Sequence, residues 1–227
     1  MTAIEPTRKN IEKPDQIKKN SARLRFWHWA TAATITGSLL TVLINSTLTD
    51  RATITPVLQD ELGKDSVTVT AQQAGSVAHA LGDKVWEVHT YFGYVLAGLF
   101  LFRLVLEAFQ LADQKFLRKL RSAYIQFRVI KKNREIARHE WVVKSLYAGF
   151  YILLGVMVIT GLFLAFEDLL APFKSIRHSV KEVHGFCMYL VLAFITVHLA
   201  GVFLAERKDS PGIVSDMING GKPLNVH

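Results

Sequence analysis

The sequence has 227 residues, of which 50% are hydrophobic, and its net charge is +8. This composition excludes an ordinary soluble domain, because the hydrophobic residues gather in four blocks of about 20 or more, the length that crosses roughly 30 Å of hydrocarbon. The basic excess is explained by membrane topology and contact with anionic lipid, which leaves nucleic acid as a poor explanation.

In chain order, residues 1–22 alternate charges with prolines and predict a flexible basic arm. Residues 23–220 are predicted to form a four-helix membrane domain, followed by a C-terminal tail over 221–227. The fold class is therefore an all-α membrane protein, a bundle of four transmembrane helices. The expected spans, several of which have tryptophans near an end, are 26–48, 85–111, 141–166 and 180–205.

The orientation follows from the lysines and arginines beside the spans. Segments 1–25 and 112–140 together with the tail after Ala205 hold 19 of these residues, against five in 49–84 and 167–179. The positive-inside rule then predicts that both termini and the middle loop are cytoplasmic.

Two connections have patterns of their own. The outer loop, 49–84, is long for a simple connection and is expected to contain a short helix that begins at Thr70 and leads into the second span. In the cytoplasmic loop, Phe116, Leu120, Tyr124 and Phe127 recur at helical spacing among basic residues. This pattern predicts an amphipathic helix at the inner membrane surface.

The histidines are the candidate ligands of this chain. Cys187 is the single cysteine, and it is not part of a C-x-x-C-H motif, so c-type haem attachment and thiolate clusters are excluded. Of eight histidines, three lie inside apolar blocks and His184 lies near the start of the fourth block. Polar residues inside a membrane are costly and usually functional.

Helix geometry indicates which histidines work together. His184 and His198 are fourteen residues apart, so they lie within about 40° of one helix face and about 21 Å apart along the axis. One imidazole is thus expected near each membrane surface. His178 is about 160° from His198 around the helix and does not substitute for His184.

The first two spans supply matching partners. With the N-terminus inside, His28 is level with His198 at the cytoplasmic end, and His89 is level with His184 at the outer end. His79 is removed from the pair, because it lies about 80° around the helix from His89 and about 15 Å further out. The sequence therefore predicts two histidine pairs at two depths.

Two imidazoles that face each other across a helix bundle can fill both axial positions of a haem iron. For any one histidine, a helix–helix hydrogen bond or a proton path is an alternative. Zinc or di-iron sites need convergence at one depth or extra carboxylates, which the apolar blocks mostly lack. The small residues Gly37, Gly93, Gly98 and Gly185 either admit a broad ring or simply pack helices.

Three stretches carry a resemblance to a known family. They are "RFWHW" at the first span, "VHTYFGYVLAGLFLFR" in the second, and the two histidines of the fourth with thirteen residues between them. Over residues 23–220 the chain resembles the bacterial cytochrome b561 and nickel–iron hydrogenase b-type cytochrome family. The resemblance implies one haem b between His28 and His198 on the cytoplasmic side, and a second between His89 and His184 on the periplasmic side.

Histidine in both axial positions leaves no open site on the iron, so electron relay is the expected chemistry. The resemblance implies a multi-pass protein of the bacterial inner membrane, in a respiratory chain. It would carry electrons between the quinone pool and a periplasmic redox protein, as the electron-transfer component of a hydrogenase or dehydrogenase. Two alternatives stay open: a stand-alone superoxide:quinone oxidoreductase, and a haem-free membrane anchor or transporter.

Arg103 is a further candidate for cofactor binding. It follows His89 by fourteen residues in the second span, on nearly the same face and toward the cytoplasmic end. It either snorkels to the inner interface with help from Glu107 one turn later, or pairs with a propionate of the inner haem. Lys144 and Lys181 are interpreted as interface anchors.

Overall fold

The computed structural model describes residues 21–109, 116–130, 134–207 and 212–220. These residues form helices joined by short turns and contain no strand, which confirms the all-α class for the part described. The predicted tail over 221–227 lies outside these ranges, and so does the predicted arm over 1–22 apart from its last two residues.

The chain divides into two compact units. The first comprises Met1–Trp29 and Leu99–His227, and the second comprises Ala30–Gly98. Two continuous α-helices, α1 (Ala22–Thr47) and α3 (Ala71–Phe109), each contribute residues to both units. Each unit has its own helix packing.

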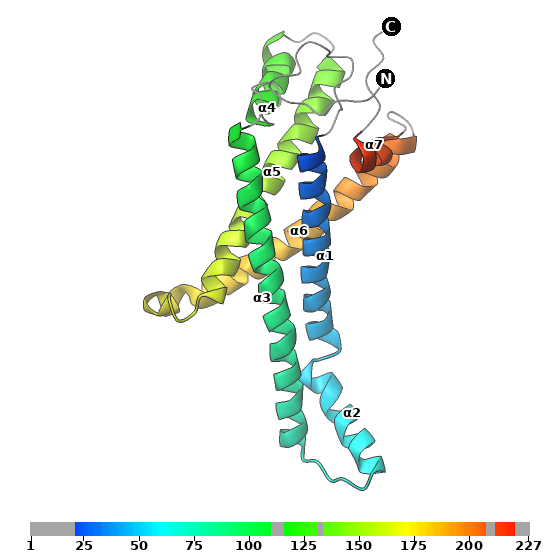
Figure 1. Cartoon of the computed structure of the whole chain (residues 1–227), viewed down its shortest axis with the longest axis vertical. Helices are drawn as coiled ribbons and strands as arrows, with labels where there is room; N and C mark the ends of the chain where they lie inside the picture. The colour runs from blue at the N-terminus through cyan, green and yellow to red at the C-terminus, as the bar shows by residue number, and fades with distance from the viewer. Residues whose placement is uncertain (1–20, 110–115, 131–133, 208–211, 221–227) are drawn as a thin grey trace. The chain divides into compact units, whose positions relative to one another are not determined.

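The second unit contains the later part of α1, the helix α2 (Arg51–Lys64) and the early part of α3 (Figure 1). Antiparallel packing of α1 on α3 depends on two glycines. A Cβ atom on Gly37 would lie 2.5 Å from the ring of Phe92, and one on Gly82 would lie 3.1 Å from Oδ1 of Asn45. Because neither glycine has a side chain, the two helices approach closely.

Helix α2 lies in the connection 49–84. The sequence predicts only a short helix that begins at Thr70 in this connection, so α2 is an additional helix that was not predicted. It begins at Asp50, whose carboxylate accepts hydrogen bonds from the backbone N–H groups of Ala52 and Thr53. The axes of α1 and α2 differ in direction by 62°.

Helix α3 begins with a reciprocal cap. Thr70 Oγ1 accepts the N–H of Gln73 at 3.2 Å, and Gln73 Oε1 accepts the N–H of Thr70 at 2.9 Å. This confirms the helix predicted to begin at Thr70. It continues without a break through most of the predicted second span, so α3 has 39 residues.

In the first unit, α5 (Arg134–Ala165) and α6 (Arg177–Arg207) form an antiparallel pair joined through the short 3₁₀ segment η4, Ala171–Ile176 (Figure 1). The rings of Phe150 and Phe194 stack between them with centroids 4.2 Å apart. Leu154, Cys187 and Val191 are buried. The two histidines of the predicted fourth span therefore lie on one continuous helix.

The connection between α3 and α5 contains the predicted helix, α4 (Phe116–Ile125), followed by the π-helical segment η3 (Gln126–Ile130). Its aromatic residues contact α5: Phe116 lies 5.3 Å from Tyr151 between ring centroids, and Phe127 stacks on Trp141 at 5.6 Å. The apolar face of this segment is thus at least partly covered by protein.

A short helix, α7 (Ile213–Asn219), is held at both ends within the first unit. The carboxylate of Glu206 accepts the N–H groups of Gly212 at 2.8 Å and Val214 at 3.2 Å. At the other end, Trp29 Nε1 donates to the carbonyl of Met217 at 3.0 Å, and Arg25 donates to the carbonyl of Ile218. These two donors flank His28 in the sequence.

Three helical stretches are long and apolar enough to cross a membrane, namely Ala71–Phe109, Ala137–Ala165 and Ala171–Arg207. The predicted first span, 26–48, falls on α1, which meets the same test only when it is combined with α2 as a bent pair. Among the described residues the count of candidate spans is therefore three, or four with that pair. Large apolar side chains such as Leu101, Ile152 and Ile159 are more than 60% exposed, as lipid-facing positions would be.

Replacing Thr70 with alanine removes the hydroxyl from the cap of α3, so the helix start should lose about 1 kcal/mol of stability. Hydrogen exchange at the backbone N–H of Gln73 and its neighbours is expected to accelerate. Thr90→Ala is the matched control, since that hydroxyl bonds only within its own helix, to the carbonyl of Trp86. Equal exchange in the two variants would contradict the capping role.

Candidate functional site

Burial separates the histidines into two groups. The four predicted ligands, His28, His89, His184 and His198, are all half-buried. The other histidines of the described residues are exposed, and they are His79, His139 and His178. The imidazoles selected by helix register are thus the ones that the fold draws away from solvent.

His28 and His198 come together in the first unit. Their ring centroids are 6.3 Å apart and their planes are inclined by 58°. Nδ1 of His28 is buried without a hydrogen-bond partner among the described residues, and His198 makes no hydrogen bond within the same part of the chain. Uncompensated burial of a ring nitrogen is costly, so this pair is a candidate for ligand binding.

Aromatic rings surround this pair. Phe194 stacks on His198 with centroids 5.8 Å apart and an interplanar angle of 6°, and Tyr147 meets the same ring edge-on at 6.0 Å. Trp29 lies edge-on to His28, with ring centroids 5.1 Å apart. The orientation of both imidazoles is therefore restricted by packing.

Arg103 is 6% exposed and lies among aromatic and acidic side chains. Its Nε donates to the hydroxyl of Tyr151 at 3.1 Å, and Nη1 lies 3.1 Å from the carboxylate of Glu107. The guanidinium also lies over the rings of Trp27 and Tyr151, at 5.8 Å and 5.3 Å. The pairing with Glu107 agrees with the expected contact one turn along the helix.

His89, in the second unit, faces two hydroxyl side chains of α1. Its Nδ1 lies 2.9 Å from Thr41 Oγ1 and 3.3 Å from both the hydroxyl and the carbonyl oxygen of Ser38. Neither partner is among the predicted site residues. Both are polar side chains inside an apolar block, and that is the signal by which the sequence marks them.

His184, in the first unit, has a similar neighbour on α5. Thr160 Oγ1 lies 2.8 Å from His184 Nδ1. The next residue, Gly161, leaves room for the imidazole, because a Cβ atom there would lie 3.3 Å from His184 Cε1. Thr160 is likewise a polar residue of an apolar span, and it is also absent from the predicted site.

The other glycines named by the sequence have open surroundings. A Cβ atom on Gly93, Gly98 or Gly185 would meet nothing within 4 Å. This space suits a broad ligand and equally suits lipid, so these glycines do not discriminate between the two.

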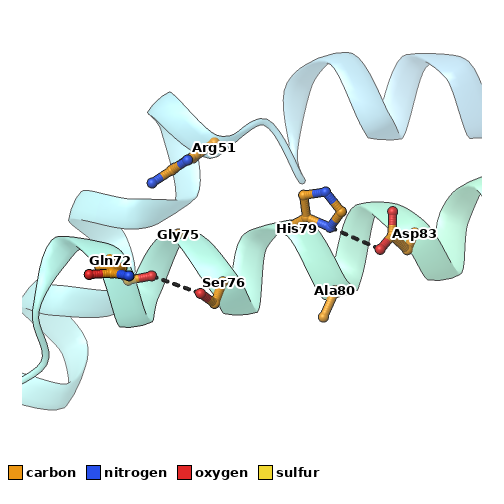
Figure 2. A pocket seen from close by; sticks show the side chains of 7 residues that line it. All are labelled: Arg51, Gln72, Gly75, Ser76, His79, Ala80 and Asp83. Carbon is orange, nitrogen blue, oxygen red and sulfur yellow. Dashed lines mark hydrogen bonds and ion pairs between the residues drawn. The ribbon is translucent and has the colours of Figure 1, made fainter.

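A pocket of about 450 Å³ lies between α2 and α3 in the second unit (Figure 2). It includes Arg51 and His79 but none of the four predicted ligands. His79 Nδ1 pairs with Asp83 at 2.9 Å, and both side chains are exposed. This position agrees with the exclusion of His79 by helix register.

Long apolar helices with half-buried histidines define a class, namely multi-pass membrane proteins with imidazoles between their helices. The chain belongs to the prokaryotic cytochrome b561 family, whose model matches residues 20–220. It is thus a b-type membrane cytochrome involved in electron transfer, and its cofactor is haem b. The comparisons with curated proteins and with solved structures returned no match.

The spacing of His28 and His198 fits a haem iron. An imidazole nitrogen binds a metal ion at about 2.0 Å, and His28 and His198 would hold a haem iron between two such nitrogens. The observed separation of their ring centroids is 6.3 Å. Nδ1 of His28 makes no hydrogen bond among the described residues, so this ring is not held by another partner that would compete with metal binding.

Replacing Gly161 with valine should displace the His184 imidazole, because the first added carbon is already 3.3 Å from its ring. The expected result is a haem-to-protein ratio well below that of the parent protein, measured by the pyridine haemochrome assay. Gly149→Val places the same side chain on α5 where a Cβ meets nothing within 4 Å, and its ratio should not change. A full haem complement in Gly161→Val would refute this constraint.

Proposed function

We propose that the protein is a dihaem cytochrome that carries electrons between a periplasmic redox partner and the quinone pool. His28 and His198 would hold one haem b, and His89 and His184 the other. Family membership provides the membrane cytochrome and its haem b, and the number of haems and the partners are the added claims. The single observation that carries the proposal is the separation of 6.3 Å between the His28 and His198 rings.

The second pair rests on helix spacing. His184 and His198 share one continuous helix, α6, and their fourteen-residue separation corresponds to about 21 Å along the axis on nearly one face. An imidazole at each level of α6 requires a partner at each level. His28 is the partner at one level, and the predicted depth of the second span makes His89 the partner at the other.

When bound between two imidazoles, haem iron exchanges single electrons without an open coordination position. The chain's own residues determine where and how that happens. Phe194, Tyr147 and Trp29 restrict the orientation of the His28 and His198 rings. Thr41 and Thr160 contact the Nδ1 atoms of the outer pair.

Arg103 is proposed to bind a propionate of the haem between His28 and His198. Its Nη1 is buried and forms an ion pair with the carboxylate of Glu107 at 3.1 Å. A buried guanidinium has five N–H donors, and those not directed at Tyr151 and Glu107 favour a further carboxylate ligand. Interface snorkelling explains a basic residue at this depth, but an exposed fraction of 6% is low for a group that reaches water.

The periplasmic and cytoplasmic assignments follow from the distribution of basic residues. If both termini are cytoplasmic, the inner pair, His28 and His198, lies near the cytoplasmic surface, and the outer pair, His89 and His184, lies near the periplasmic surface. Electrons then enter at one surface and leave at the other. The proposed setting is the bacterial inner membrane, with a hydrogenase or dehydrogenase subunit or a soluble redox protein as the periplasmic partner.

Alanine at each of the four proposed ligands tests the haem count. The parent protein should contain two b haems per chain, and His28→Ala, His198→Ala, His89→Ala and His184→Ala should each lose one. Quantified reduced-minus-oxidised spectra with protein determination measure this. Members of a pair should remove the same spectral component, because either ligand is needed to hold that haem.

The exposed histidines provide matched controls. His79→Ala, His139→Ala and His178→Ala should retain both haems, since none of these rings is buried. One haem in the parent protein, or loss of a haem in a control with retention in His184→Ala, would overturn the assignment. Reduction of quinone by superoxide with the isolated chain alone would favour the stand-alone oxidoreductase over the relay.

Replacing Arg103 with leucine should lower the reduction potential of the inner haem, because a positive charge near the propionate no longer opposes the oxidised iron. Potentiometric titration of the two haems measures the change, and the outer haem should be unaffected. Lys144→Leu is the control, since Lys144 is partly exposed and pairs with Glu140 at 2.7 Å. If Arg103→Leu leaves the content and the reduction potential of the inner haem unchanged, Arg103 does not bind the propionate.

A further inference from the structure

Two threonines on different helices contact the proposed outer ligands in the same way. Thr41 on α1 lies 2.9 Å from Nδ1 of His89, and Thr160 on α5 lies 2.8 Å from Nδ1 of His184. The two contacts occur in separate units of the fold. Their recurrence suggests a common role for the two hydroxyls.

The direction of the first hydrogen bond follows from the single proton of a hydroxyl. Thr41 Oγ1 donates that proton to the carbonyl of Ser38 at 2.6 Å, within its own helix. Its oxygen therefore accepts from His89, so Nδ1 of His89 carries the ring proton. The carbonyl of Ser38, 3.3 Å from the same nitrogen, is a second acceptor and favours the same tautomer.

The direction of the hydrogen bond between Thr160 and His184 follows in the same way. Thr160 Oγ1 donates to the carbonyl of Val156 at 2.7 Å, one turn back on α5. The hydroxyl oxygen then accepts the proton of His184 Nδ1 at 2.8 Å. In both histidines, the nitrogen that retains the lone pair is Nε2, the atom at the far side of the ring.

The inner pair is different. His28 and His198 contact aromatic rings, and neither ring makes a hydrogen bond to a hydroxyl among the described residues. In a metal-bound imidazole, a hydrogen bond donated by the nitrogen that does not bind the metal fixes the ring and increases its basicity. The two sites therefore differ in how strongly their ligands donate electrons.

We propose that Thr41 and Thr160 are positioning residues that hold His89 and His184 in the Nδ1–H tautomer and lower the reduction potential of the haem these histidines bind. This rests on the proposed dihaem function. More basic axial ligands stabilise the oxidised iron, so the outer site has a lower potential than the inner site. Electrons that enter at the periplasmic surface then move downhill to the inner site and on to quinone.

Valine and serine at the two positions separate the hydroxyl from the shape of the side chain. Thr41→Val and Thr160→Val remove the hydrogen bond with little change in volume, and Thr41→Ser and Thr160→Ser retain it. Potentiometric titration of the full-length purified protein, monitored by haem absorbance, should show the lower of two potentials shifted upward in both valine variants. The serine variants should keep the parent value.

Thr34→Val is the matched control on α1. Thr34 is also buried, but among the described residues its hydroxyl bonds only to the carbonyl of Ala30 in its own helix, so both potentials should stay at their parent values. A valine variant that loses one haem while the corresponding serine variant keeps it also supports the positioning role. Equal haem loss in the valine and serine variants would overturn the positioning role, because the shape of the side chain and not its hydroxyl would then be responsible.

The outcomes separate this inference from the function on which it rests. If His89→Ala and His184→Ala each remove one haem but both valine variants keep the parent potentials, the positioning role is wrong and the dihaem function stands. A shift of the higher potential instead of the lower would also refute the positioning role. If His89→Ala and His184→Ala remove no haem, the dihaem proposal itself fails.

Discussion

A neutral imidazole in an apolar helix bundle has to satisfy its ring nitrogens without water, and the packing around the half-buried histidines follows from that requirement. Where a neighbouring helix presents a hydroxyl, as Thr160 does for His184, the ring proton has an acceptor. Where the neighbours are aromatic, as Phe194 is for His198, the ring is oriented by stacking and its nitrogens remain available. Close contact between α5 and α6 makes both arrangements possible, and Gly161 provides the room that the His184 ring needs.

Several features could be predicted from the sequence because they depend on one helix alone. Apolar blocks indicate spans, and three of the four coincide with helices that are long and apolar enough to cross a membrane. The fourteen-residue spacing on α6 needs only an unbroken helix, which the structure contains. The cap at Thr70 was equally local, since Thr and Gln three residues apart satisfy each other's backbone groups. The roles of the four histidines and Arg103 stay predictions.

Apart from the approach of His28 to His198, contacts between two elements could not be predicted. Periodicity shows which face of α5 is apolar but does not say that Thr160 meets His184, or that Tyr151 and Trp27 enclose Arg103. Helix α2 was missed because it is polar and contains Pro56 in its interior, where proline ordinarily breaks a helix. The first span is poor in strongly apolar residues and rich in threonine, so composition describes it least well.

The hydrogen bonds to α7 also have a consequence for the order of assembly. Arg25 and Trp29, on either side of His28, bond to carbonyls 193 and 188 residues further along the chain. Those contacts cannot form until the ribosome has synthesised through Ile218. The segment that carries His28 is synthesised before the other described helices, yet these two hydrogen bonds form only after those helices have been made. Its final geometry is therefore acquired late, in a chain that is already inserted.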